Sequence, residues 1–222
     1  MNMPIYKIAS FEINDIPLIR YVAKKHKPMI ISTGVADLDD IQLALDTCYK
    51  EGNYDISLLK CTSEYPATYE QANLLTIPDM IHRFGIPVGV SDHTMGSLVP
   101  IVAVSLGATI VEKHFILSRT NGGPDSAFSM EPNEFREMVD SIRNVERALG
   151  NVKYDITDYQ RGKRRSLYAR TDIHCGDVFT DQNVGSYRPG VGLSPQYWDQ
   201  IMGKTCKREI VKGDVLRQED LK

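Results

Sequence analysis

Up to about residue 150 the chain alternates between short apolar runs that end in polar residues and longer stretches with apolar positions at helical spacing. The short runs predict strands at residues 6–10, 29–34, 56–61, 88–94 and 110–115. The longer stretches predict helices at residues 16–25, 38–49, 77–84, 96–107 and 132–149. Strands and helices that alternate in this way predict an α/β fold with a parallel sheet covered by helices.

Two of the predicted strands carry a histidine next to their last residue, His93 and His114. Consecutive parallel strands are usually neighbours and deliver their last residues to the same edge of the sheet, so we expect the two imidazoles to meet. Because side chains alternate along a strand, Ser91 shares a face with His93, and Glu112 shares a face with His114. This pattern predicts a site for a divalent metal and an anion. The alternative is a pair of unrelated polar histidines at the rim.

Beyond residue 150 the pattern changes to short β-like runs broken by turns. The sequence Ile-x-x-Gly-Asp-Val that starts at Ile173 recurs at Ile210. Such a repeat predicts a small pseudo-symmetric β domain with matched Gly-Asp turns. We therefore expect a first domain at residues 1–150, a polar linker at 151–164 and a second domain at 165–222.

Composition and charge indicate which partners and which cellular compartment to expect. The 222 residues carry a net charge of −3, which implies no general attraction to nucleic acid, and the basic cluster at 163–165 is the one feature that favours such binding. The four cysteines show no CxxC spacing and predict reduced, buried thiols in a cytoplasmic protein. The longest apolar stretch, residues 98–111, is shorter than the roughly 20 residues of a membrane span, so we expect a soluble protein that does not bind membranes.

A series of motifs occurs here in the order in which sialic acid synthases carry them. They are KIASFE at 7–12, STG at 32–34, CTSEYP at 61–66, SDHT at 91–94, EKHF at 112–115, GPD at 123–125 and RPG at 188–190. The chain resembles this family over essentially its whole length. The resemblance implies a TIM (β/α)₈ barrel followed by an antifreeze-like (SAF) domain. It also implies an enzyme that condenses phosphoenolpyruvate with an N-acylated hexose to give a nine-carbon 2-keto sugar acid.

Finer details are more similar to pseudaminic acid synthases than to N-acetylneuraminate synthases. These details are SFE at 10–12, LKC at 59–61, DSAF at 125–128 and RSLYA at 165–169. They imply a 2,4-diacetamido-2,4,6-trideoxy-altrose acceptor. The alternative is an N-acetylneuraminate synthase that uses N-acetylmannosamine.

The resemblance also implies residue roles. Phosphoenolpyruvate carries phosphate and carboxylate groups and needs a cation with several donors. The residues that the resemblance implies for it are Lys7, Ser10, Ser32 and Ser91. A divalent ion, Mn²⁺ in the family with Mg²⁺ or Co²⁺ as alternatives, would bind His93 and His114 and polarise the sugar aldehyde. Lys7 could instead be a strand-end lysine in solvent, and each serine a helix N-cap.

Four further residues match family positions that act on the acceptor sugar. Glu12, Tyr65 and Asp125 would contact or orient the sugar and the metal-bound water. Arg188 would reach from the SAF domain into the partner subunit's barrel in a domain-swapped homodimer. Each has a simpler alternative: Glu12 as a helix-start carboxylate, and the others as turn residues.

The chain departs from the family in length. A closed (β/α)₈ barrel takes about 250 residues, whereas only five βα units are seen here. We therefore expect a partial barrel without the family's first three units, from a fragment or a truncated product that is inactive alone. Two other functions stay open: a non-catalytic interaction or dimerisation module, and a metal-dependent aldolase or hydrolase on another barrel, which leaves the SAF-like repeat unexplained.

Overall fold

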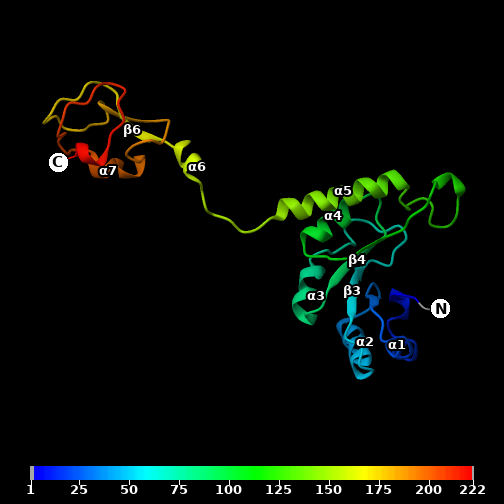
Figure 1. The fold of residues 1–222 in the computed structure, drawn as a ribbon. Helices are drawn as coiled ribbons and strands as arrows, with labels where there is room; N and C mark the ends of the chain where they lie inside the picture. Colours follow the sequence, from blue (N-terminus) through cyan, green and yellow to red (C-terminus); the bar gives the residue numbers. More distant parts are fainter. Residues whose placement is uncertain (1–2, 222) are drawn as a thin grey trace. The chain divides into compact units, whose positions relative to one another are not determined.

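A computed structural model describes residues 3–221, and the chain divides into two compact units between Asn151 and Val152 (Figure 1). The first unit contains a five-stranded parallel sheet with the strand order β1-β2-β3-β4-β5. Its strands are β1 (Tyr6–Ile8), β2 (Met29–Ser32), β3 (Ile56–Cys61), β4 (Val88–Asp92) and β5 (Val111–Lys113). The predicted α/β fold is therefore confirmed.

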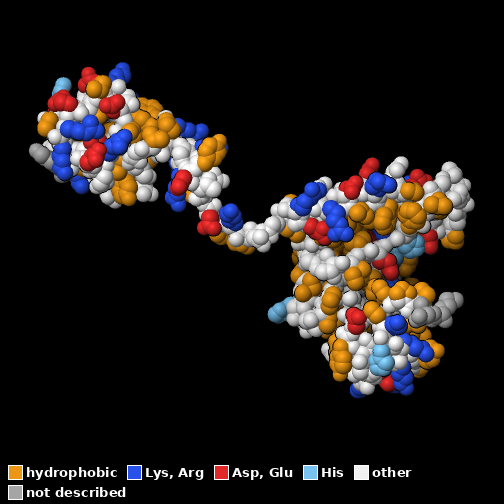
Figure 2. Space-filling view, viewed as in Figure 1, with side chains coloured by type: hydrophobic (Ala, Val, Ile, Leu, Met, Phe, Trp, Pro, Cys, Tyr) orange, Lys and Arg blue, Asp and Glu red, His pale blue; other side chains and the backbone are white. Residues whose placement is uncertain are grey.

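Helices follow the strands in alternation. They are α1 (Ile16–Ala23), α2 (Leu38–Lys50), α3 (Thr76–Phe84), α4 (Leu98–Ser105) and α5 (Pro132–Leu149). Local chemistry sets their ends: the Asp37 carboxylate accepts a hydrogen bond from the Asp40 backbone N–H at the start of α2, 2.9 Å away, and Gly85 ends α3 with a φ of 64°. Charged side chains of both signs lie along the exposed side of α5 (Figure 2).

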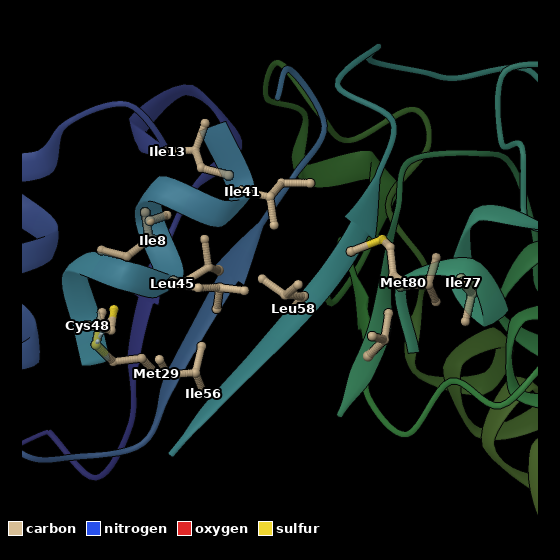
Figure 3. Close-up of a cluster of buried hydrophobic side chains, with 14 of the residues drawn as sticks. Ile8, Ile13, Met29, Ile41, Leu45, Cys48, Ile56, Leu58, Ile77 and Met80 are labelled. Atoms are coloured by element: carbon tan, nitrogen blue, oxygen red, sulfur yellow. Dashed lines mark hydrogen bonds between the residues drawn. The ribbon is translucent and has the colours of Figure 1, made fainter. Parts of the chain in front are cut away.

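The core of this unit lies between one face of the sheet and its helices. Leu45 and Cys48 of α2 point toward the strands, where Cys48 contacts Met29 and Leu45 lies near Leu58 (Figure 3). Leu58 and Ile8 are almost completely buried. Burying a side chain of this size stabilises the fold by about 1.5–3 kcal/mol, so this layer holds the strands in place.

The sheet is strongly curved. β1 and β5 are its two edge strands, yet the Lys7 ammonium on β1 lies 3.0 Å from a Glu112 carboxylate oxygen on β5. Side chains from opposite edges can meet only if the sheet curls. The first unit is thus a half-barrel. The strand-end residues that the sequence singles out lie on its concave side.

The second unit is small and β-rich. Its elements are α6 (Asp158–Gly162), β6 (Ser166–Ala169), β7 (Val184–Tyr187) and α7 (Trp198–Ile201), with β6 and β7 antiparallel. Ile173 and Ile210 pair with each other in an antiparallel bridge. The Asp177 and Asp214 backbone N–H groups close matching turns in the two Gly-Asp repeats, donating over 2.9 and 3.0 Å. Helix α6 lies within the segment that the sequence predicts as a linker.

The cysteines are all free. Cys48, Cys61 and Cys206 are buried, as predicted, but the prediction is wrong for Cys175, which is exposed because it lies in the first Gly-Asp turn. Over residues 3–221, none of the helices combines the length and apolar character that crossing a membrane requires.

Replacing Gly89 in β4 should destabilise the first unit. A β-carbon there would lie 2.6 Å from Ile110 Cβ and 2.7 Å from Leu59 Cδ2, so Gly89→Ala should lower the free energy of unfolding by about 2–3 kcal/mol. Denaturant titration followed by circular dichroism measures this. Gly162→Ala is the control, since a β-carbon at that position would have no heavy atom within 4 Å, and it should change stability by less than about 0.5 kcal/mol. Equal stability of the two variants would contradict the expected clash.

Candidate active site

The two histidines lie side by side at the carboxyl edge of the sheet. His93 directly follows β4 and His114 directly follows β5, and their ring centroids are 5.1 Å apart. His93 Nδ1 lies 2.7 Å from the Thr62 carbonyl oxygen. A carbonyl only accepts, so Nδ1 donates, and in the neutral ring the lone pair is on Nε2. This is the arrangement in which a histidine binds a metal through Nε2.

His114 is oriented by a carboxylate. Its Nδ1 lies 3.5 Å from a carboxylate oxygen of Asp125. Burial and the nearby His93 lower the pKa of His114. Burial also opposes the charged form of His93, but hydrogen bonds to Cys61 and the Thr62 carbonyl outweigh it and raise the pKa of His93. The two rings thus differ in basicity, and His114 stays in the neutral, metal-binding form to a lower pH than His93 does.

Two aromatic rings line the histidine pair. The Tyr65 ring centroid is 4.1 Å from that of His93 and 5.9 Å from that of His114, and Tyr65 is 46% exposed. The Phe128 centroid lies 4.9 Å from that of His114. Tyr65 therefore presents an open aromatic surface directly beside both imidazoles.

Glu112 connects two of the predicted anion-binding residues. Its Oε1 atom accepts a hydrogen bond from the Ser91 hydroxyl over 2.7 Å and another from the Lys7 ammonium over 3.0 Å. Burial opposes ionisation of Glu112, but these two hydrogen bonds outweigh it and lower its pKa. The sequence places Glu112 on the His114 face without giving it a role. The alternation of side chains along β5 is the signal that points to it.

Hydroxyl groups gather at the ends of the first strands. Ser10 Oγ accepts a hydrogen bond from the Gly34 backbone N–H over 3.0 Å. A β-carbon on Gly34 would lie 2.9 Å from Ser10 Oγ and 3.1 Å from Cys61 Sγ, so only glycine leaves room for these groups. Ser32 Oγ is buried and has no hydrogen-bond partner within residues 3–221. A buried hydroxyl without a partner is costly, and a bound anion would satisfy it.

Cys61 lies at the centre of this cluster, although the sequence pattern indicates only a buried thiol. Burial raises the pKa of its thiol, but hydrogen bonds with His93, Ser10, Ser91 and Ser63 outweigh burial, and the pKa falls to about 7. Cys48, buried in the apolar core, shows the opposite behaviour, with its pKa raised to about 11 by burial. Cys61 therefore lies among polar groups, unlike Cys48 in the apolar core.

Two predicted site residues are not grouped with the histidines. Glu12 Oε2 accepts a hydrogen bond from the Ala9 backbone N–H over 2.9 Å and caps a 3₁₀ turn, Ser10–Glu12, which is the simpler role considered for it. Arg188 belongs to the second unit, where it is exposed directly after β7. There it lines a pocket of about 370 Å³ that also includes Tyr168 and Tyr187.

The metal-binding capacity rests on the two imidazoles. Within residues 3–221 there is no group of three or more His, Cys, Asp or Glu side chains placed to hold a metal ion. Two imidazole nitrogens suit a first-row transition metal whose other positions are filled by water or substrate. Two imidazoles whose ring centroids lie 5.1 Å apart therefore fit a divalent ion that these two protein ligands would hold.

Comparison with known proteins agrees with this geometry. Residues 1–154 match the NeuB family, and residues 164–222 match the SAF domain. The chain is 42% identical to a pseudaminic acid synthase of Campylobacter jejuni, over 98% of this chain and 64% of that protein. It is 35% identical to an N,N'-diacetyllegionaminic acid synthase of the same species, over 98% of this chain and 67% of that protein.

A solved structure extends the match to the fold. The crystal structure of the spore coat polysaccharide biosynthesis protein SpsE from Bacillus subtilis superposes with a TM-score of 0.64 at 33% identity, covering 98% of this chain and 67% of that one. The chain thus spans about two thirds of the length of these proteins. The resemblance to sialic acid synthases is confirmed, and the chain belongs to the NeuB family, with a SAF domain following its half-barrel.

Proposed function

We propose that this chain forms part of a nonulosonic acid synthase, which condenses phosphoenolpyruvate with an N-acylated hexose. The observation that carries the proposal is the placement of His93 and His114 beside a lysine and several hydroxyl groups at one edge of the sheet. The identity of 42% to a pseudaminic acid synthase supports 2,4-diacetamido-2,4,6-trideoxy-altrose as the acceptor. In this reaction carbon 3 of phosphoenolpyruvate attacks the sugar aldehyde, water adds at carbon 2, and phosphate leaves with cleavage of its carbon–oxygen bond.

Phosphoenolpyruvate would bind Lys7, Ser10, Ser32 and Ser91. Ser32 supports this proposal most directly, because its buried hydroxyl finds no partner within residues 3–221. Lys7 already bonds to Glu112, but an ammonium has three N–H donors and can hold an anion at the same time. A fixed cation among neutral donors is the combination that a phosphate and a carboxylate require.

The acceptor would occupy the histidine side of the site. A bound divalent ion, for which we propose Mn²⁺ with Mg²⁺ or Co²⁺ as alternatives, supplies Lewis-acid polarisation of the aldehyde. The Thr62 carbonyl accepts a hydrogen bond from His93 Nδ1, and Asp125 lies 3.5 Å from His114 Nδ1, so each ring would bind the ion through Nε2. Tyr65 would offer its exposed ring to the sugar, and Asp125 would offer a carboxylate oxygen to a sugar hydroxyl. Glu12, whose Oε2 caps the turn after β1, would contribute its other carboxylate oxygen from the β1 side.

We also propose that the protein is cytoplasmic and forms a domain-swapped homodimer. The four free cysteines support the location, since thiols stay reduced in the cytosol. The exposed position of Arg188 supports the second proposal, because this side chain is free to reach an acceptor bound to another subunit. A symmetric exchange of SAF domains would then complete two sites at once.

Turnover with two acceptors tests the proposed reaction, measured on a protein in which the family's first three βα units precede this chain. We expect phosphate release and a nine-carbon product, followed by mass spectrometry, with the diacetamido-trideoxy hexose about 100-fold faster than with N-acetylmannosamine. The reverse preference would favour an N-acetylneuraminate synthase instead. Binding of phosphoenolpyruvate without turnover of either sugar would instead indicate a non-catalytic module.

Lys7→Ala tests the anion site without requiring turnover. Loss of a charge-assisted hydrogen bond costs about 1.5–3 kcal/mol, so we expect the dissociation constant of phosphoenolpyruvate to rise about 10- to 100-fold in calorimetry. The control is Lys24→Ala, which removes an exposed lysine paired with Glu51 on the helical side and should leave binding unchanged. Equal affinity of Lys7→Ala and the parent chain would remove Lys7 from the site.

Mixing two inactive variants tests whether Arg188 acts in trans. In the same lengthened protein, Arg188→Ala and His114→Ala are each expected to abolish turnover, and after subunit exchange each heterodimer should regain about one working site. Activity is measured alongside native mass spectrometry, which confirms the exchange. If heterodimers form and activity does not return, Arg188 acts within its own chain or has no role in the reaction.

A further inference from the structure

A buried ion pair joins β4 to β5 on the side of the sheet opposite the histidines. The Lys113 ammonium lies 2.6 Å from Asp92 Oδ2, and the two side chains are only 1% and 2% exposed. Asp92 directly precedes His93, and Lys113 directly precedes His114. Because side chains alternate along strands, the pair faces the helical layer while the imidazoles face the concave side.

The pair also holds the residue after His93. Asp92 accepts hydrogen bonds from the backbone N–H of Thr94 over 2.9 Å and from the Thr94 hydroxyl over 3.1 Å. Lys113 donates a second hydrogen bond to the Thr94 carbonyl oxygen. Both neighbours of His93 in the chain are therefore tied to one charged group on β5.

The backbone pairing of these strands ends just before the histidines. The last register pair is Asp92 with Lys113, and β5 contains only three residues. Short strands are held weakly by their backbone hydrogen bonds alone. The relative position of the two imidazoles therefore depends in part on what fixes this final pair.

Stability alone does not account for two charges at this position. Removing both ions from water costs several kcal/mol each, and replacing a buried pair by apolar residues is often neutral or stabilising. What a short, charge-assisted hydrogen bond adds is a fixed distance and direction. We propose that Asp92 and Lys113 are positioning residues that set the spacing of His93 and His114 for a shared divalent ion, an inference that rests on the proposed metal-dependent function.

Mn²⁺ binding to the 222-residue chain tests this role apart from activity. The variants are Asp92→Asn, Lys113→Met and the double variant Asp92→Asn/Lys113→Met, and free Mn²⁺ is measured by electron paramagnetic resonance at a temperature where circular dichroism shows the native state. The single variants should melt at lower temperature, because each leaves an unpaired buried charge, and the double variant should regain most of that loss. All three should bind Mn²⁺ about 10-fold more weakly or worse. If the single variants do not fold, the Mn²⁺ affinity of the double variant alone tests the positioning role.

A merely structural role predicts a different result. Asn53→Ala is the matched control, since the buried Asn53 amide bonds to the Lys27 carbonyl over 3.0 Å at the amino ends of the strands. It should lower the melting temperature and leave Mn²⁺ affinity within about twofold of the parent chain. A stable double variant that binds Mn²⁺ as tightly as the parent would overturn the positioning role.

His93→Ala and His114→Ala separate failure of this inference from failure of the proposed metal site. If both abolish Mn²⁺ binding while the double variant binds normally, only the role of Asp92 and Lys113 is wrong. If the parent chain does not bind Mn²⁺, or the histidine variants bind it unchanged, the metal site is wrong and the positioning role fails with it.

Discussion

The alternation of side chains along parallel strands is the constraint on which the rest of the first unit depends. On one face, Leu58 and Val90 pack beneath the helices and supply the burial that holds the sheet together. On the other face, every second residue is free to be polar, as at Ser91 and Glu112. Because all the strands are parallel, these polar residues collect at one edge. A single pairing geometry thus creates the core and the candidate site together.

Local patterns in the sequence are sufficient to predict the order of elements and much of the pairing. β3 and α5 have the predicted bounds, and Ser91 and Glu112 meet as the alternation requires. β4 and β5 are shorter than predicted, since their polar ends turn into loops at His93 and His114. The candidate residues of neighbouring strands could be grouped from the sequence because neighbouring strands determine their own contacts.

Contacts that depend on curvature or on several strands could not be predicted in this way. The Lys7–Glu112 ion pair joins the two edges of the sheet, and no local pattern shows how far a sheet curls. The lowered pKa of Cys61 needs side chains from several separate segments. Lys60 and Lys113 end apolar runs and would be expected to reach solvent, yet both side chains are buried on the helical side. The sequence alone does not show whether a lysine near a strand end is exposed or buried, because this depends on the helices that cover that face of the sheet.

The site has two halves with different chemistry, and Glu112 lies between them. Lys7 of β1, Ser10 of the 3₁₀ turn after it and Ser32 of β2 suit an anion, while β4 and β5 lead into the two imidazoles, which suit a cation. The Glu112 carboxylate bonds to Lys7 and Ser91, so it holds the lysine in place even without a ligand and keeps a negative charge near the histidines. In the proposed reaction an anionic substrate and a polarised aldehyde must lie side by side without exchanging places. The Glu112 carboxylate favours a cation at the imidazole pair, while the Lys7 ammonium that it holds supplies the positive charge that an anion requires.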